Sequence, residues 1–267
     1  MRLRLRYLYA VLLVTLPCVA CKKIIQVNLN NVSPQIVIEG NVTNDAGPYQ
    51  VQISRSVNYA ANNVFPPVTD ATVSITDSTT GQTDALVEVD SGVYVTQSLI
   101  GRPEHTYQLL VTDDGQQYSA TSTMPLPVKL DSVTFEQNTN INGISEITAI
   151  VNFQDPRGVT NYYQFTEAVN GKAVPDIFVF DDRLSDGKYI EEPLFNDTAY
   201  LIPGAALLLT MNCVDENTFN YFNELSNVTA TAGIQSTTPA NPTSNINNGA
   251  LGYFSAHTTT FEQLYVY

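Results

Sequence analysis

The residues best suited to chemistry lie in one acidic stretch, DDRLSDGKYIEE, in the second half of the chain. Its carboxylates are Asp181, Asp182, Asp186, Glu191 and Glu192. Oxygen-rich loops can hold calcium, and an EF-hand loop needs acids at its first, third and fifth positions and a final Glu. Counting from Asp182, the third position is Leu184 and the twelfth is Pro193, so that motif is absent. Two interpretations stay open: a solvated acidic turn, which is the default, and an irregular calcium site near Asp181, Asp182 and Asp186.

The sequence contains no recognisable catalytic motif. No Gly-x-Ser-x-Gly elbow, His-Glu-x-x-His or Cys-x-x-Cys pattern occurs. His105 precedes a predicted strand and is expected in a loop, whereas His257 is expected just after a strand. Cys213 lies in ALLLTMNCV, in phase with apolar residues, and is expected to be a buried small side chain rather than a nucleophile. Pairs of acids able to cleave a glycosidic bond cannot be identified without a fold. The protein is therefore predicted not to be an enzyme and to carry no cofactor.

The elements that must position these residues are predicted to be strands. Alternating segments such as PYQVQISRSV and TYQLLVTDDGQQYSATST are separated by turn signals, among them Asp114-Gly115. Short strands at this spacing indicate an antiparallel sandwich, so residues 34–126 are predicted to form an immunoglobulin-like β-sandwich. Pro125 and Pro127 favour an extended connection. Residues 127–267 are predicted to form a second antiparallel β-rich domain with one helix near 215–228, N-capped by Asp215.

The N-terminus is typical of an exported protein. Three arginines precede a short apolar run, and small residues end at Val19-Ala20, directly before Cys21. This pattern resembles a lipobox, so residues 1–20 are predicted to be a signal peptide and Cys21 the acylated residue. Residues 21–33 would then be the tether, and Cys18 would be discarded. The alternative is an ordinary signal peptide cut near Ala20.

The charge of the chain excludes one class of partner. The formal net charge is −14, and such a surface repels nucleic acid, whose binding depends on Lys and Arg. The same acidity could attract a basic partner, or it could serve solubility alone.

One polar stretch, residues 235–249, is long and contains little to bury. It must either run over its own domain or order itself around a partner. We expect a partner surface formed by this stretch and by the strand that follows it, with Asn241, Pro242, Asn245, Asn247, Tyr253 and Phe254. A loop packed over its own domain is the alternative.

Three segments together resemble a known family. They are IVIEGNVTNDAGPYQVQISRSV, VNFQDPRGVTNYYQF and PANPTSNINNGALGYFSAHT. The chain resembles the Bacteroidota lipoproteins catalogued as a domain of unknown function, number forty-two forty-nine. The resemblance implies an outer-membrane lipoprotein encoded near TonB-dependent receptors, and it supplies no catalytic residue. Three Asp-Ser/Thr triplets also resemble the O-glycosylation signal of that phylum, with Ser78, Ser132 and Thr198 as acceptors; the alternative is chance, because Ser, Thr and Asp are abundant in turns.

These observations favour a lipid-anchored, non-catalytic accessory or ligand-binding partner of a TonB-dependent uptake receptor. Its small-molecule or glycan ligand is not identified by the sequence. Lys22 and Lys23 follow the lipid site where surface-exported relatives carry acids, which leaves the cell surface and the periplasmic face both open. An adhesive immunoglobulin-like module and a cell-envelope hydrolase are the alternatives.

Overall fold

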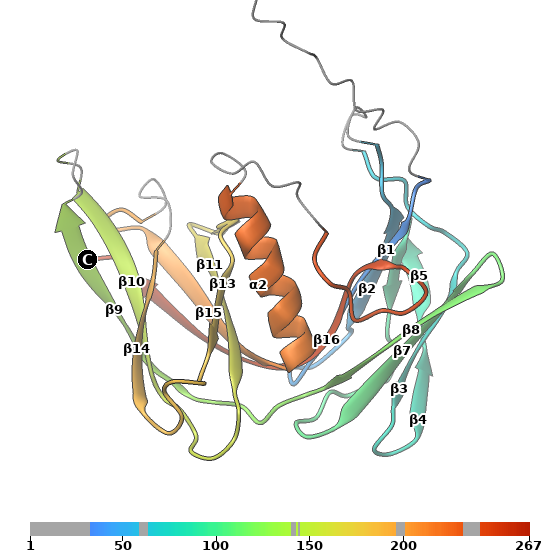
Figure 1. Ribbon diagram of the computed structural model, residues 1–267, viewed down its shortest axis with the longest axis horizontal. Helices are drawn as coiled ribbons and strands as arrows, with labels where there is room; N and C mark the ends of the chain where they lie inside the picture. Colours follow the sequence, from blue (N-terminus) through green and yellow to red (C-terminus); the bar gives the residue numbers. More distant parts are fainter. Residues whose placement is uncertain (1–32, 59–63, 140–142, 144, 196–200, 232–240) are drawn as a thin grey trace, which may run out of the picture. The chain divides into compact units, whose positions relative to one another are not determined.

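The protein is built mainly of β-strands, as predicted. The structure is a computed structural model that describes residues 33–58, 64–139, 143, 145–195, 201–231 and 241–267. In chain order the elements are β1 (Ile36–Thr43), β2 (Gln50–Arg55), β3 (Thr72–Asp77), β4 (Gln82–Ala85), β5 (Val87–Asp90), β6 (Val93–Val95), β7 (Thr106–Asp113), β8 (Gln116–Thr123), β9 (Leu130–Thr139), β10 (Ser145–Gln154), β11 (Tyr162–Val169), β12 (Lys172–Ala173), β13 (Phe178–Asp181), β14 (Tyr189–Leu194), β15 (Ala206–Val214), α2 (Glu216–Thr231) and β16 (Leu251–Tyr265) (Figure 1).

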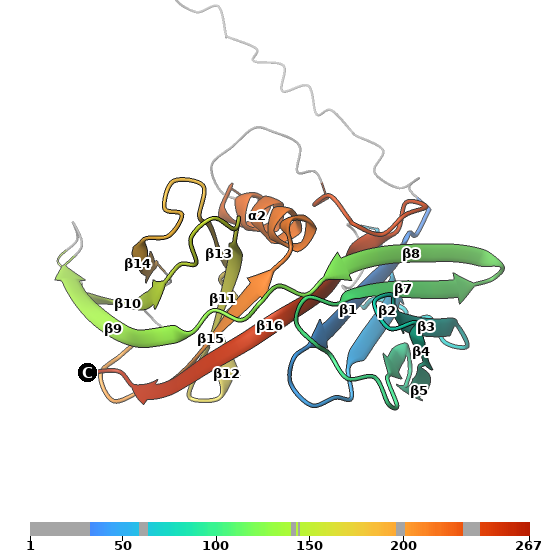
Figure 2. The same ribbon diagram turned by 90° about the horizontal axis from the view of Figure 1, so that it is seen from below.

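These strands form three sheets. A nine-stranded sheet runs in the order β12-β11-β15-β16-β1-β2-β6-β5, with β13 also paired to β11. A four-stranded sheet has the order β4-β3-β7-β8, and a three-stranded sheet has the order β14-β10-β9. The C-terminal strand β16 lies in the middle of the large sheet and joins its two halves, because it pairs antiparallel with β15 and parallel with β1 (Figure 2). Pro34–Tyr267 accordingly form one compact unit.

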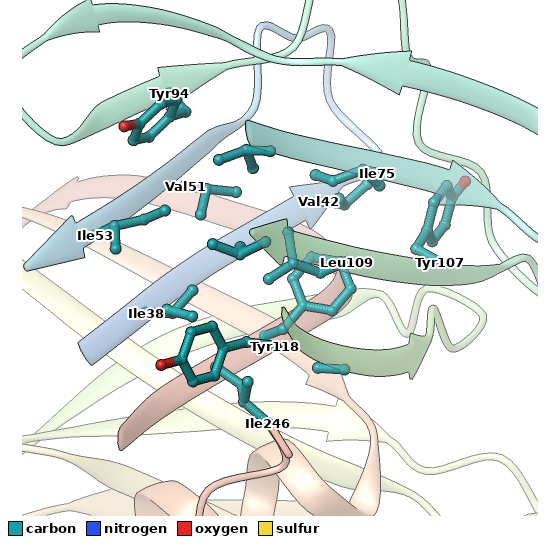
Figure 3. Close-up of a cluster of buried hydrophobic side chains, with 14 of the residues drawn as sticks. Ile38, Val42, Val51, Ile53, Ile75, Tyr94, Tyr107, Leu109, Tyr118 and Ile246 are labelled. Atoms are coloured by element: carbon teal, nitrogen blue, oxygen red, sulfur yellow. The ribbon is translucent and has the colours of Figure 1, made fainter. Parts of the chain in front are cut away.

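The first hydrophobic core lies between the four-stranded sheet and the β1-β2-β6 part of the large sheet. Alternate side chains of each strand enter it, as the period of two requires. The largest fully buried members include Ile38, Tyr94, Tyr107 and Leu109 (Figure 3). The packing is compatible with the predicted immunoglobulin-like sandwich. The C-terminal segment also enters this core, with Ile246, Ala250, Phe254 and Ala256, although the sequence placed it in the second domain.

The second core gathers residues from Val128 to Val266. It lies where β9, β10 and β14 pack against β11 and β15, and aromatic rings fill its centre. Phe153 lies edge-on to Tyr163, with ring centroids 4.8 Å apart. Cys213 is buried here, and the backbone N–H of Val128 donates to its Sγ over 3.4 Å. The burial predicted for this thiol is therefore confirmed.

The turn into β16 explains the run Asn-Gly-Ala-Leu-Gly-Tyr-Phe. Asn248 and Gly249 both have left-handed backbone, with φ of 56° and 74°. Gly252 has φ of 92°, and a Cβ built on it would lie 2.1 Å from the carbonyl oxygen of Ile38. Only glycine allows β16 to approach β1 this closely.

The helix α2 begins where the sequence predicts. The backbone N–H of Thr218 donates to Asp215 Oδ1 over 2.9 Å, which is the geometry of an N-cap. Its aromatic residues then cover neighbouring strands: Phe219 packs against Tyr162, and Phe222 packs against Tyr253 with ring centroids 4.8 Å apart. Within the described part of the chain, no helix is long and apolar enough to cross a membrane.

Candidate functional site

Three carboxylates converge beside the second core. Asp155 follows β10, Asp182 follows β13, and Asp186 lies in the turn before β14. One oxygen from each lies within 4.8 Å of the others. Asp155 is 1% exposed and Asp182 is 2% exposed, whereas Asp186 faces solvent. We call these three residues the acid cluster.

Hydrogen bonds hold the acid cluster in place. The hydroxyl of Tyr163 donates to Asp155 Oδ1 over 2.5 Å, and the backbone N–H of Gly187 donates to Asp155 Oδ2 over 2.8 Å. The backbone N–H of Asn161 donates to Asp182 Oδ2 over 2.9 Å. That of Gly158 donates to Asp186 Oδ1 over 2.6 Å. The segment 158–161 therefore contacts two of the three carboxylates.

Burial shifts the proton affinities in the acid cluster. It raises the pKa of Asp182, and the neighbouring charges of Asp155 and Asp186 raise it further, while the hydrogen bonds from Asn161 act against this. Burial, together with the hydrogen bond to Asp155, also raises the pKa of Tyr163, so its hydroxyl keeps its proton and remains a donor. The hydrogen bonds from Gly158, Asn161, Tyr163 and Gly187 come from neutral donors, so they supply no positive charge to the cluster.

The composition of the cluster differs from the sequence expectation. Asp182 and Asp186 come together as predicted, but Asp181 turns to the guanidinium of Arg183, which donates to it from Nε and Nη2 over 2.8 Å each. Asp155 takes its place, and Glu191 and Glu192 lie apart in β14. Asp155 was missed because β11, β12 and β13 separate it from Asp182 in the sequence, and the pairings of β10 with β14 and of β11 with β13 bring the two regions together. Carboxylate oxygens suit calcium, and the irregular calcium site stays a prediction.

An apolar groove of about 390 Å³ adjoins the acid cluster. Its apolar lining comes from the connection after β8, from the 156–162 segment and from the end of β15: Met124, Pro125, Leu126, Pro156, Val159, Tyr162 and Val214. Leu126 is 57% exposed and Val159 is 60% exposed. Glu104 also lines the groove. Exposed apolar side chains around a concave surface are typical of a ligand site.

The groove lies beside a second hollow, of about 370 Å³. Val159 and Thr160 line both spaces, and Asp182 and Asp186 line the second one. The apolar lining of the groove and the carboxylates of Asp182 and Asp186 therefore lie on either side of Val159 and Thr160. We call the two spaces together the composite site.

The two histidines lie in different parts of the fold, each beside one polar side chain. His257 lies within β16 rather than after a strand, and its Nδ1 is 3.0 Å from Ser255 Oγ. In the described ranges this serine is the only hydrogen-bond partner of the His257 ring, and burial lowers the pKa of His257 to about 4, which makes it a poor base. His105 precedes β7 as predicted, with Nδ1 2.8 Å from Asp77 Oδ2. Burial also raises the pKa of the Cys213 thiol, which opposes thiolate formation.

Much of the predicted partner surface is used within the fold. Phe254 is fully buried, and Asn245 bonds both the N–H and the carbonyl of Phe254, at 2.9 and 2.7 Å. Asn247 bonds Ser119, and Tyr253 packs on α2. Asn241 is exposed and Pro242 half-buried. These contacts favour the alternative of a loop packed over its own domain, for residues 241–249. Residues 235–240 lie outside the described residues.

The predicted modification sites are only partly covered by the structure. Ser78 is exposed in the turn after β3, whereas Ser132 is half-buried in β9. Thr198 and the lipidation site Cys21 lie outside the described residues.

Comparison with known proteins decides the family. The sequence matches the family described as Domain of unknown function (DUF4249) over residues 22–263. The chain belongs to this family. Membership confirms the resemblance seen in the three sequence segments, and it indicates no catalytic class. No curated protein matches the chain. The composite site is the feature of this DUF4249 protein that bears on its function.

Proposed function

We propose that the protein is a lipid-anchored, non-catalytic ligand-binding accessory of a TonB-dependent uptake receptor in the outer membrane. The observation that carries the binding role is the composite site, where an apolar groove meets the carboxylates of Asp182 and Asp186. The lipobox-like sequence before Cys21 supports the anchor. The receptor partnership rests on what resemblance to the Bacteroidota lipoproteins implies.

A pull-down from a Bacteroidota host tests this function. The tagged full chain would be recovered in mild detergent, and co-purifying membrane proteins identified by mass. We expect a large receptor with the wild type and with the control variant Cys18→Ser, whose altered residue leaves with the signal peptide. We expect much less receptor with Cys21→Ser, because two or three acyl chains are needed for stable anchoring.

Incorporation of labelled palmitate controls for the anchor. Recovery of the acylated protein alone would overturn the uptake role and favour the adhesive module. Absence of label on the wild type would overturn the anchor.

A hydrolase is the second candidate, because one observation favours it. Asp182 and Asp186 have carboxylate oxygens within 4.8 Å, and the raised pKa of Asp182 is a property of general acids. However, both residues come from one turn and contact the same 158–161 segment, whereas glycosidase carboxylates flank the bond they cleave. Release of reducing sugar from a polysaccharide panel, lost in Asp182→Asn, would establish the hydrolase; no release supports binding.

A further inference from the structure

The apolar part of the composite site has the size of a small ligand. A groove of about 390 Å³ lies within the range of small-molecule sites. Met124, which is fully buried, lines this groove, and the side chains of Leu126 and Val159, which also line it, are exposed. An apolar ligand would remove these side chains from water, which is the main source of affinity in such sites.

The charged part favours a cation. Glu104 lines the groove, and Asp182 and Asp186 line the adjoining hollow. Of the described residues that line either space, Arg183 is the only cation, and two hydrogen bonds to Asp181 engage its guanidinium. Charge at this site is therefore complementary to an ammonium or guanidinium group, and an anion would meet two or three carboxylates.

We propose that the composite site binds a small amphipathic organic cation, with its apolar body in the groove over Leu126 and Val159 and its cationic group at Asp182 and Asp186. This inference rests on the proposed binding function and adds the chemical class of the ligand. Val159 and Thr160 line both spaces, so the apolar part and the charged part of the site are adjacent.

A matched set of three probes tests the ligand class. They are 4-phenylbutylammonium, the neutral 4-phenylbutanol and the anionic 4-phenylbutanoate, which differ only in the terminal group. Binding to the full chain, held in phosphatidylcholine nanodiscs free of detergent, would be followed by ligand-detected NMR, with empty nanodiscs subtracted. We expect the ammonium to bind at least tenfold more tightly than the alcohol, and the carboxylate more weakly than both.

Three variants locate the binding. Asp186→Asn keeps the oxygen that Gly158 contacts but removes the charge, so the preference for ammonium over alcohol should fall severalfold while alcohol binding stays unchanged. Leu126→Ser should weaken both probes alike. Asp114→Asn, at a carboxylate whose side chain is 92% exposed in the β7–β8 turn, should change neither. Thermal unfolding of each variant checks that it is folded.

Three results would overturn the proposal: equal binding of all three probes, no binding of any at millimolar concentration, or an unchanged ammonium preference in Asp186→Asn. If the pull-down recovers a receptor and any of these three results is also obtained, the proposed ligand class is wrong but the proposed accessory role is still supported. Calcium that displaces the ammonium from the wild type but not from Asp186→Asn would support a shared cation position.

Discussion

The hydroxyl of Ser122 in β8 donates a 2.6 Å hydrogen bond to Asp215, the residue that caps α2. The same hydroxyl accepts a 2.7 Å hydrogen bond from the backbone N–H of Ala256 in β16. One serine therefore joins three segments that are far apart in the sequence. Ser122 is 2% exposed, so these hydrogen bonds are sheltered from water. Loss of a hydrogen-bond partner at such a buried position costs more free energy of unfolding than at the surface.

We expect Ser122 and Asp215 to be energetically coupled. Asp215→Ala should lower the free energy of unfolding by about 1–2 kcal/mol through loss of the N-cap. Ser122→Ala should cost about 1–3 kcal/mol, because it leaves buried polar groups without a partner. Urea unfolding of both single variants and the double variant should give a coupling energy of at least about 0.5 kcal/mol. Ser78→Ala, at an exposed turn, is the control; strictly additive effects would contradict the coupling.

Gly252 and Gly249 should respond differently to a methyl group. Both have positive φ, but a Cβ at Gly252 would overlap the backbone of Ile38, whereas a Cβ at Gly249 meets no atom within 4 Å. Gly249→Ala should therefore cost only the strain of left-handed backbone, about 1–2 kcal/mol. Gly252→Ala should cost clearly more, or prevent folding, because β16 cannot keep its pairing with β1. Similar losses for the two variants, measured by denaturant unfolding, would argue against this close approach.

His257 should make the protein less stable in mild acid. Its folded-state pKa of about 4 lies below its ordinary value of 6.5, so the unfolded chain binds the proton more readily. The free energy of unfolding should fall as the pH decreases from about 6.5 to 4, by about 3 kcal/mol from this residue. Urea unfolding across this range should show a smaller decrease in His257→Gln than in the wild type. An unchanged slope in His257→Gln would refute the assignment.

Asp182 should have the opposite pH dependence. Its pKa is raised by folding, so the folded state holds the proton more tightly and the ionised carboxylate is a cost at neutral pH. Asp182→Asn keeps an oxygen for the N–H of Asn161 and removes the charge. We expect this variant to be more stable than the wild type at pH 7, with a difference that shrinks as the pH falls through the acidic range. Thermal unfolding at several pH values measures this; a variant less stable at pH 7 would count against it.

Most local features of this fold could be predicted from the sequence. The Asp114-Gly115 turn joins β7 to β8, Asp215 caps α2, and Cys213 is buried, each as expected. Such features depend on the alternation of side chains and on turn and cap chemistry within a few residues. The candidate site was predictable only in part. Asp182 and Asp186 share one turn, but Asp155 and the groove around Leu126 come from other parts of the chain.

The sequence alone determined the strand-rich class, the one predicted helix and the family, because these depend on local patterns and on a motif that spans the chain. Tertiary packing determined the pairing of β16 with both β1 and β15, and with it the placing of Phe254 in the first core. Tertiary packing also brought Asp155, and not Asp181, into the acid cluster. The physical reason is that strand partners are selected by burial and by close backbone approach, as between Gly252 and Ile38. The local sequence pattern of one strand does not specify which other strand will pair with it.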